Sequence, residues 1–401
     1  MNEQAFSGYV DRVDQDIISG WAANTVLADQ PVNLSIYING ARVAMVRCDG
    51  LRADAIAAGF AGARKFVFEL KPFLKPGRNH VEVGFEQINL LVPNGSHQID
   101  QSGSADIGDF WSNRYSQKNE LMTRWWHSEY IVRRINKRVC GESLPRTSSG
   151  LHQLALQRFS GQAPFARGVS IGCGMAGKER AVLKCGLVDH FTLFELSSVG
   201  IERGRQLAQE EGLADRMEFR MEDGLTGETG EELYDLVYWN NALHHMFDVK
   251  AALEWSRRVL KVGGVLLMDD FVGPTQMQWS DRLLQINQDM RKLIPQKYMR
   301  DPANPARLLS NVVSRPDPQA FKMIDPSECA DSARILPELL RIFPDAWVQK
   351  TGGGIYHLGL NDILHNIIVA EDFQLLEQLL ELDDQCIEIG ETHYAVAIAV
   401  K

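Results

Sequence analysis

The first 95 residues show the alternation of apolar and polar positions that is typical of short β-strands. Val32, Leu34, Ile36 and Ile38 alternate with polar neighbours, so one face of this segment is apolar. Asn39-Gly40 follows at once, and an extended pattern resumes over 41–46. Asn-Gly predicts a hairpin, because both central positions of such a turn need positive φ. Further strand-like runs at 66–70 and 81–85, separated by Pro and Gly, favour an all-β sandwich over residues 1–95.

Residues 96–165 are predicted to form a linker and a helical cap. The stretches 93–98 and 101–104 are rich in Gly, Ser and Asn, which is linker composition. From about 108 to 160 the pattern is helical and aromatic, with Trp111, Tyr115, Trp125, Trp126 and Tyr130. These aromatic rings either cover a bound ligand or form the apolar face of a helix.

Residues 166–401 alternate strand-like runs with amphipathic helices. Strands are predicted at 167–172, 190–195, 217–221, 234–239, 263–270, 345–351 and 393–400. Helices are predicted at 175–185, 198–211, 246–260, 359–368 and 372–383, with Asp248 as an N-cap. This order predicts an α/β fold with a mostly parallel sheet that helices cover on both faces.

The stretch 276–345 interrupts the alternation. Six of the 15 prolines lie between residues 295 and 326, which is unlike a further strand–helix unit. We expect an insertion that is either a surface connection or a lid over a substrate.

Composition narrows the class of protein. The 401 residues carry 42 basic and 52 acidic side chains, a net charge of −10, which argues against nucleic acid as a partner. No apolar run approaches the ~20 residues of a membrane span, and the N-terminal segment lacks the pattern of a signal peptide. The six cysteines form no CxxC pair, so we expect free thiols and a cytoplasmic protein.

A glycine-rich turn between a predicted strand and a predicted helix is the first candidate site. Gly172, Cys173, Gly174 and Gly177 lie in the segment Val169-Ser-Ile-Gly-Cys-Gly-Met-Ala-Gly177. Gly172 permits a sharp turn, Gly174 lets the backbone approach a cofactor, and Gly177 is expected to let helix and sheet pack closely. The spacing is also that of nicotinamide enzymes, so the loop alone does not separate the two classes of adenosine cofactor.

Acidic residues end the next two strands. Glu195, followed by Leu196, lies 23 residues after Gly172, near the offset of a carboxylate that binds ribose hydroxyls. Asp223, followed by Gly224, is placed to accept the adenine amino group, and Asn240 ends the fourth strand beside the same ligand. We expect all of these residues at the cofactor site.

Taken together, the segments SIGCGMAG, FELS, MEDG, YDLVYWNNALHH and VLKVGGVLLMDD resemble the successive motifs of class I S-adenosylmethionine-dependent methyltransferases. The resemblance covers about 165–275 and implies a Rossmann-like sheet of seven strands whose last two form an antiparallel pair. It implies S-adenosyl-L-methionine as the cofactor. One departure is Ser170, which stands where the family often has an acid.

A narrower likeness concerns the acceptor. Phe271-Val-Gly-Pro274, Asp325-Pro-Ser-Glu328, Gly352–His357 and Asp362–Asn366 resemble bacterial methyltransferases associated with glycosyltransferases and polysaccharide assembly. The N-terminal GYVD, GWA and NLSIYING segments resemble β-sandwich modules fused to such enzymes, which would bind carbohydrate or dock a glycosyltransferase partner. The resemblance implies O-methylation of a sugar or glycan hydroxyl in glycan biosynthesis. The alternatives are a small-molecule acceptor that is not a glycan, or an inactive scaffold that only binds the cofactor.

Candidate catalytic residues follow the fourth and fifth strands. A hydroxyl acceptor must lose a proton, and His244 or His245 lies at the strand edge where open α/β sheets bind ligands. The alternative is that these histidines have no catalytic role and either pack within the fold or contact the cofactor. Asp270, next to Asp269, is placed to orient a histidine or to bind a sugar hydroxyl. His357 and His365 would share a helix face, but no carboxylate set completes a site, so we assign no residue to a metal.

Overall fold

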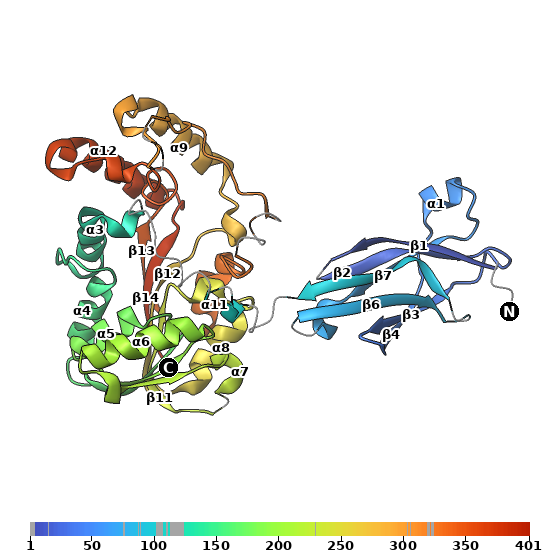
Figure 1. The fold of residues 1–401 in the computed structure, drawn as a ribbon, viewed down its shortest axis with the longest axis horizontal. Helices are drawn as coiled ribbons and strands as arrows, with labels where there is room; N and C mark the ends of the chain where they lie inside the picture. Colours follow the sequence, from blue (N-terminus) through green and yellow to red (C-terminus); the bar gives the residue numbers. More distant parts are fainter. Residues whose placement is uncertain are drawn as a thin grey trace. The chain divides into compact units, whose positions relative to one another are not determined.

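The computed structural model divides the chain into two compact units, residues 1–106 and 107–401. It describes residues 5–14, 16–74, 77–86, 88, 90–101, 107–109, 111–112, 124–228, 230–302, 304, 306–318, 321 and 325–401. The expected aromatic Tyr115 lies outside these residues. Figure 1 shows the elements of each unit, and we describe the units separately.

The first unit contains two antiparallel sheets. One sheet orders β1 (Phe6–Val13), β2 (Ile17–Asn24) and β5 (Arg64–Glu69), and the other orders β4 (Ala41–Arg47), β3 (Asn33–Ile38), β6 (Gly77–Phe85) and β7 (Leu91–Gln101). Val10 and Ile18 from the first sheet share one buried cluster with Leu34 and Ile36 from the second. A short helix, α1 (Ala53–Ala57), precedes β5.

The predicted hairpin is confirmed, whereas the predicted linker differs from the structure. Asn39 (φ 53°) and Gly40 (φ 80°) make the left-handed turn between β3 and β4. Residues 93–101 belong to β7, and the pairing of 96–101 with β6 outweighs their turn-like composition. Residues 102–104 of the predicted linker lie outside the described residues.

The second unit contains a seven-stranded sheet in the order β10-β9-β8-β11-β12-β14-β13. The strands are β8 (Phe165–Ile171), β9 (Val188–Phe194), β10 (Met217–Arg220), β11 (Tyr234–Asn240), β12 (Leu260–Phe271), β13 (Trp347–Gly352) and β14 (Tyr394–Val400). β14 runs antiparallel to both β12 and β13, while the pairs from β10 to β12 are parallel. The expected seven strands and the antiparallel last pair are confirmed.

Both faces of this sheet are covered by helices. Val237 and Trp239 of β11 pack in a cluster with α8 (Val249–Val259) and α11 (Ile335–Ile342). Leu236 and Tyr238 point to the opposite cluster, which includes residues of α3 (Glu129–Cys140), α4 (Ser149–Arg158), α5 (Gly177–Lys184) and α6 (Ser198–Glu210). Alternate side chains of a strand point to opposite faces, so a strand covered on both faces is apolar throughout. Asp248 caps α8 as predicted, accepting the Ala251 N–H at 3.1 Å.

A third cluster joins the insertion to the late helices. α9 (Asp281–Leu293) and α12 (Val369–Glu388) lie together at one end of the unit (Figure 1) and share buried side chains with Phe271 and Tyr394 of the sheet. In the part of the chain that the structure describes, no helix combines the length and apolar character needed to cross a membrane.

The helix predicted at 359–368 is wrong. This stretch forms turns and one short 3-10 segment, Leu364–Asn366, so His357 and His365 do not share a helix face. The carboxylate of Asp383 accepts the N–H groups of Gly353 and Ile355, which fixes the preceding turn by a tertiary contact.

Truncation of a central sheet residue tests this assignment of the core. Leu266 of β12 is fully buried, whereas Leu293, at the end of α9, is 84% exposed. Leu266→Ala is expected to lower the free energy of unfolding of the second unit by about 2–5 kcal/mol, because the mutation removes buried apolar contacts and leaves a cavity. Leu293→Ala, the matched control, is expected to change it by less than about 0.5 kcal/mol. Denaturant titration of both variants measures the difference, and equal losses would contradict the assignment.

Candidate functional site

The glycine-rich turn joins β8 to α5 at the carboxyl edge of the sheet. Gly172 (φ 66°) and Gly174 (φ 56°) adopt left-handed conformations that favour glycine. Gly172 is exposed, and a Cβ there would lie 3.2 Å from the Cβ of Ala242, in the turn after β11. Cys173 lies between them, and burial raises the pKa of its thiol well above the usual range. The turn thus presents backbone at the place where a ligand can approach.

Gly177 does not have the role expected from its spacing. A Cβ at Gly177 would meet only the end of the Arg180 side chain, at 3.9 Å, so this glycine does not mediate close packing of helix and sheet. The close approaches lie elsewhere: a Cβ at Gly224 would lie 2.7 Å from the ring of Phe194.

Glu195 connects the glycine turn to the end of β9. Its Oε2 accepts the Gly174 N–H at 2.6 Å, and its Oε1 accepts the N–H groups of Leu196 and Ser197 at 2.9 and 2.8 Å. The side chain is almost fully buried; burial raises its pKa, while these backbone bonds oppose the rise. The structure therefore places Glu195 and Leu196 directly against the turn.

The other predicted cofactor residues differ in their surroundings. Asp223 is half-buried at the end of β10, and its Oδ1 caps the short helix α7 (Gly224–Gly227) by accepting the Leu225 N–H at 2.9 Å. Asn240 is buried, and its amide donates to Ser148 Oγ and to the hydroxyl of Tyr238 at 2.8 and 2.6 Å. The side-chain amide of Asn240 thus donates its hydrogen bonds to other side chains of the second unit.

Ser170, which stands where the family often has an acid, binds an acid that comes from α5. Ser170 Oγ donates to Oε1 of the buried Glu179 at 2.8 Å. A carboxylate therefore lies under the turn, although it comes from the following helix. In the sequence, the serine at position 170 was a sign that an acid at this place would have to come from another element.

A cavity of about 360 Å³ lies at the carboxyl edge of the sheet, and its wall includes Lys178 of α5 and Asn241, which follows β11. It combines aromatic rings with ionisable groups, and it is lined by Trp111, Trp125, Trp126, Val132, Ile135, Asn136, Thr147, Ser148, Lys178, Asn241, His244, His245, Asp269, Glu328, Thr351 and Tyr394. Lys178 was not expected from the sequence; its Nζ lies 3.4 Å from the carbonyl oxygen of Asn240, and burial lowers its pKa.

His244 and Asp270 form a buried ion-pairing dyad behind this cavity. His244 Nδ1 lies 2.5 Å from Asp270 Oδ1, and Asp270 also accepts the N–H groups of Ala242 and Leu243. Burial favours the neutral imidazole, but the charge and hydrogen bond of Asp270 outweigh it and raise the pKa of His244. Burial raises the pKa of Asp270, but His244 and the backbone donors reverse this, so the pKa is lowered and Asp270 stays ionised.

His245 lies beside His244 with a different set of partners. The two rings are 4.1 Å apart between centroids. His245 Nδ1 lies 3.0 Å from Ser327 Oγ, which donates in turn to Asp325 Oδ1 at 2.8 Å. Burial, followed by the charge of His244, lowers the pKa of His245 to about 3, so this ring is neutral.

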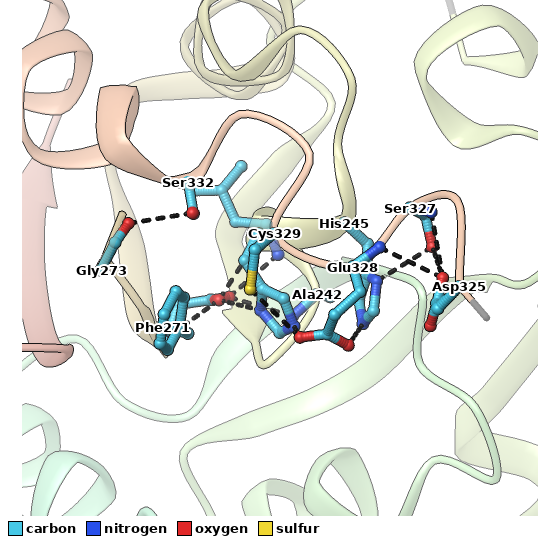
Figure 2. A network of polar contacts seen from close by, with 12 residues as sticks. Ala242, His245, Phe271, Gly273, Asp325, Ser327, Glu328, Cys329 and Ser332 are labelled. Carbon is cyan, nitrogen blue, oxygen red and sulfur yellow. Dashed lines mark hydrogen bonds and ion pairs between the residues drawn. The ribbon is translucent and has the colours of Figure 1, made fainter. Parts of the chain in front are cut away.

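The turn 325–329 brings a third group to the two histidines. Figure 2 shows Glu328 of this turn next to His245. Glu328 Oε1 lies 3.7 Å from His244 Nε2, and Glu328 Oε2 lies 3.9 Å from His245 Nε2. The Ala330 N–H donates to the carbonyl of His244 at 3.1 Å, which fixes the turn against the site. The insertion therefore supplies part of the site.

The described residues 107–109 and 111–112 also contact the site, through Gly108, Trp111 and Ser112. A Cβ at Gly108 would lie 2.5 Å from the Leu196 carbonyl, and Ser112 Oγ lies 3.0 Å from Ser197 Oγ. The ring of Trp111 meets that of His245 edge-on at 5.1 Å between centroids. Among the expected aromatic residues, Trp111, Trp125 and Trp126 line the cavity.

Comparisons with known proteins agree with this geometry. Residues 169–268 match the sequence profile of the family described as "Methyltransferase domain". A sterol 24-C-methyltransferase of Gibberella zeae is 29% identical over 151 residues, and the match covers 38% of either protein. The chain thus spans about two fifths of the length of this curated relative.

Solved structures show partial similarity. Geranyl diphosphate C-methyltransferase of Streptomyces coelicolor, with Mg²⁺, geranyl diphosphate and S-adenosyl-L-homocysteine, is 14% identical, with a TM-score of 0.42 over 74% of this chain and 97% of that chain. Phosphoethanolamine N-methyltransferase 2 of Haemonchus contortus is 14% identical, with a TM-score of 0.42 over 76% of this chain and 62% of that chain. The profile match lies within the seven-stranded sheet of the second unit, and the strand order of that sheet is the one expected from the resemblance to class I methyltransferases.

The contact between His244 and Asp270 leads to a prediction about the pKa of His244, which can be tested without a substrate. His244 is expected to keep its proton above the ordinary pKa of 6.5, because Asp270 stabilises the imidazolium. In Asp270→Asn the attraction is removed and burial dominates, so the pKa of His244 is expected to fall below 6.5. NMR titration of the imidazole nitrogens measures both values. Asp281→Asn, at a carboxylate that is 94% exposed, is the control and should leave the pKa of His244 unchanged.

Proposed function

We propose that the protein is an S-adenosyl-L-methionine-dependent methyltransferase that acts on a hydroxyl group of its acceptor. The observation that carries the proposal is the glycine turn bound to Glu195, at the same carboxyl edge of the sheet as a cavity whose wall includes His244, which Asp270 holds from behind. The family match over residues 169–268 supports the reaction class.

The residues present at the turn fit this cofactor. Gly172 leaves exposed backbone where a nucleoside can approach, and Glu195 brings a carboxylate to the same point. We assign ribose binding to Glu195, adenine binding to Asp223, and backbone contacts to Gly172, Cys173 and Gly174. When bound, the cofactor supplies a methyl group activated by a sulfonium sulfur.

The chain contributes mainly position and proton removal. Holding an acceptor hydroxyl in line with the methyl group is worth up to about 7–11 kcal/mol of the barrier. We assign proton removal to the groups at the end of the cavity, where Asp270 orients His244 and Ser327 orients His245. The aromatic rings of Trp111, Trp125 and Trp126 exclude water from this space.

For the acceptor we propose a sugar or glycan hydroxyl. Aromatic faces and carboxylates in one cavity suit a sugar, which has apolar ring faces and many hydroxyl groups. The likeness to methyltransferases of polysaccharide assembly supports the same class. We assign the first unit as a module that binds carbohydrate or docks a glycosyltransferase.

A non-glycan small molecule is the second candidate acceptor. The relative from Gibberella zeae is named for a sterol, and the tryptophan-rich wall of the cavity also suits an apolar ring system. Incubation with radiolabelled cofactor and separate sugar, glycolipid and sterol fractions distinguishes the candidates by which fraction gains the methyl group.

Cofactor binding is tested at Glu195. Glu195→Gln is expected to weaken S-adenosylmethionine binding about 10- to 100-fold, because it replaces charge-assisted hydrogen bonds with neutral ones. Glu210→Gln, at an exposed position of α6, is the matched control. Isothermal titration of both variants and the parent measures affinity. A parent that shows no thermal stabilisation by S-adenosylmethionine, where 100 times the dissociation constant gives about 2.7 kcal/mol, would refute the proposal.

Proton removal is tested at His244. His244→Ala is expected to lower kcat about 10²- to 10⁴-fold with little change in cofactor affinity, since the ring lies at the acceptor end of the cavity. His190→Ala, at an exposed histidine at the other end of the sheet, is the control and should keep full turnover. Turnover is measured with the fraction that accepts the methyl group. Full activity of His244→Ala would remove His244 from the mechanism.

A further inference from the structure

We propose that His244 Nε2, His245 Nε2 and the Glu328 carboxylate bind one divalent transition-metal ion. Their ligand atoms all lie within 4.8 Å of one another. The three residues come from the turn after β11 and from the turn 325–329, so the fold assembles a set that their spacing in the sequence does not indicate.

The orientation of both imidazoles carries the inference. Each ring uses Nδ1 for a partner on the far side: Asp270 for His244, and Ser327 for His245. Ser327 donates its own proton to Asp325, so its oxygen accepts from the Nδ1–H of His245. A neutral ring with hydrogen on Nδ1 presents a lone pair at Nε2. Such a carboxylate or hydroxyl partner at the second nitrogen is the usual support of a metal-binding histidine.

On the cavity side, the two Nε2 atoms and the Glu328 carboxylate are close together without forming hydrogen bonds to one another. His245 Nε2 lies 3.9 Å from Glu328 Oε2, which is too long for a hydrogen bond, and Glu328 Oε1 accepts from the Cys329 thiol at 3.2 Å. The His244 Nε2 distance to Glu328 Oε1, 3.7 Å, is too long for a hydrogen bond. Two ligands of a tetrahedral Zn²⁺ ion lie about 3.4 Å apart, so small side-chain rotations would complete the set.

The local charge also suits a cation. The Asp270 carboxyl group is fully buried behind His244, and Glu328 adds a second carboxylate on the cavity side. Lys178 is the positive side chain of the cavity wall. A dication between the imidazoles and Glu328 would offset the two carboxylates.

The ligand types select the class of metal. Two imidazoles and one carboxylate suit Zn²⁺, Co²⁺ or Fe²⁺ better than Mg²⁺, which prefers oxygen ligands. All three residues line the 360 Å³ cavity, so the remaining coordination positions open toward the proposed acceptor. This assignment departs from the sequence, from which we expected no metal ligand. With the ion bound, both nitrogens of His244 would be engaged, so His244 would act as a ligand in place of the proton-removing role proposed above.

Metal binding is tested directly on untagged full-length protein. Titration with Co²⁺ is expected to give one equivalent of visible ligand-field absorption, and Zn²⁺ is expected to abolish it by competition. Glu328→Gln and His245→Ala should each weaken Co²⁺ binding at least about 10-fold, and Ser327→Ala, which removes the support of His245, about 10- to 100-fold. Circular dichroism confirms that each variant is folded.

The control is His190→Ala, which removes an exposed histidine and should leave Co²⁺ binding unchanged. Parent protein that binds no Co²⁺ or Zn²⁺, or Glu328→Gln and His245→Ala that both bind like the parent, would overturn the assignment. If chelation leaves methyl transfer intact and no metal binds, the metal site is wrong and the proposed function stands. If metal binds but S-adenosylmethionine does not, the proposed function fails and the metal site stands.

Discussion

The arrangement of the second unit at its carboxyl edge depends on one buried carboxylate. Asp270 has no exposed surface, and it accepts the backbone N–H groups of Ala242, Leu243, His244 and Phe271 as well as His244 Nδ1. An isolated buried charge is costly, whereas one that accepts several hydrogen bonds stabilises its surroundings. The same oxygens that fix the turn after β11 therefore orient the imidazole, so the shape of the turn and the chemistry of the histidine are not independent.

The insertion is the second determinant of the site. α9, in the first part of the insertion, packs in the third hydrophobic cluster. The later part of the insertion places residues 325–329 beside the histidines. The Gln276 N–H donates to the carbonyl of Cys329 at 2.9 Å, which joins the two ends of the insertion next to the site. Because Glu328 of its return turn lines the cavity, the insertion is more than a surface connection.

The sequence predicted the parts of this structure that depend on local pattern. The strands β8 to β14, the hairpin at Asn39-Gly40 and the glycine turn follow from periodicity and turn chemistry, which neighbouring residues determine. The helix predicted over 359–368 was wrong, and residues distant in sequence bind this stretch: Arg291 Nε donates to the Gly359 carbonyl and the Trp125 N–H donates to Asn361 Oδ1, both at 2.9 Å. Likewise, the approach of Glu328 to His245 depends on how a long insertion returns, which no spacing rule encodes. Glu195 lies between these cases. Its position in the sequence predicted that it belongs to the site, but not that its carboxylate would accept the N–H groups of Gly174 and Leu196.

The place of β14 in the sheet has a consequence for how the chain is synthesised. β14 pairs with β12 on one side and β13 on the other, yet it follows both in the chain. While a ribosome has made only the first 390 or so residues, β12 has an open edge and β13 has no neighbour to hold it. Tyr394, which lines the cavity, arrives on the same strand. A nascent chain therefore completes its sheet and this wall of the cavity in one late step, and until then an apolar strand edge is open to pairing with other chains.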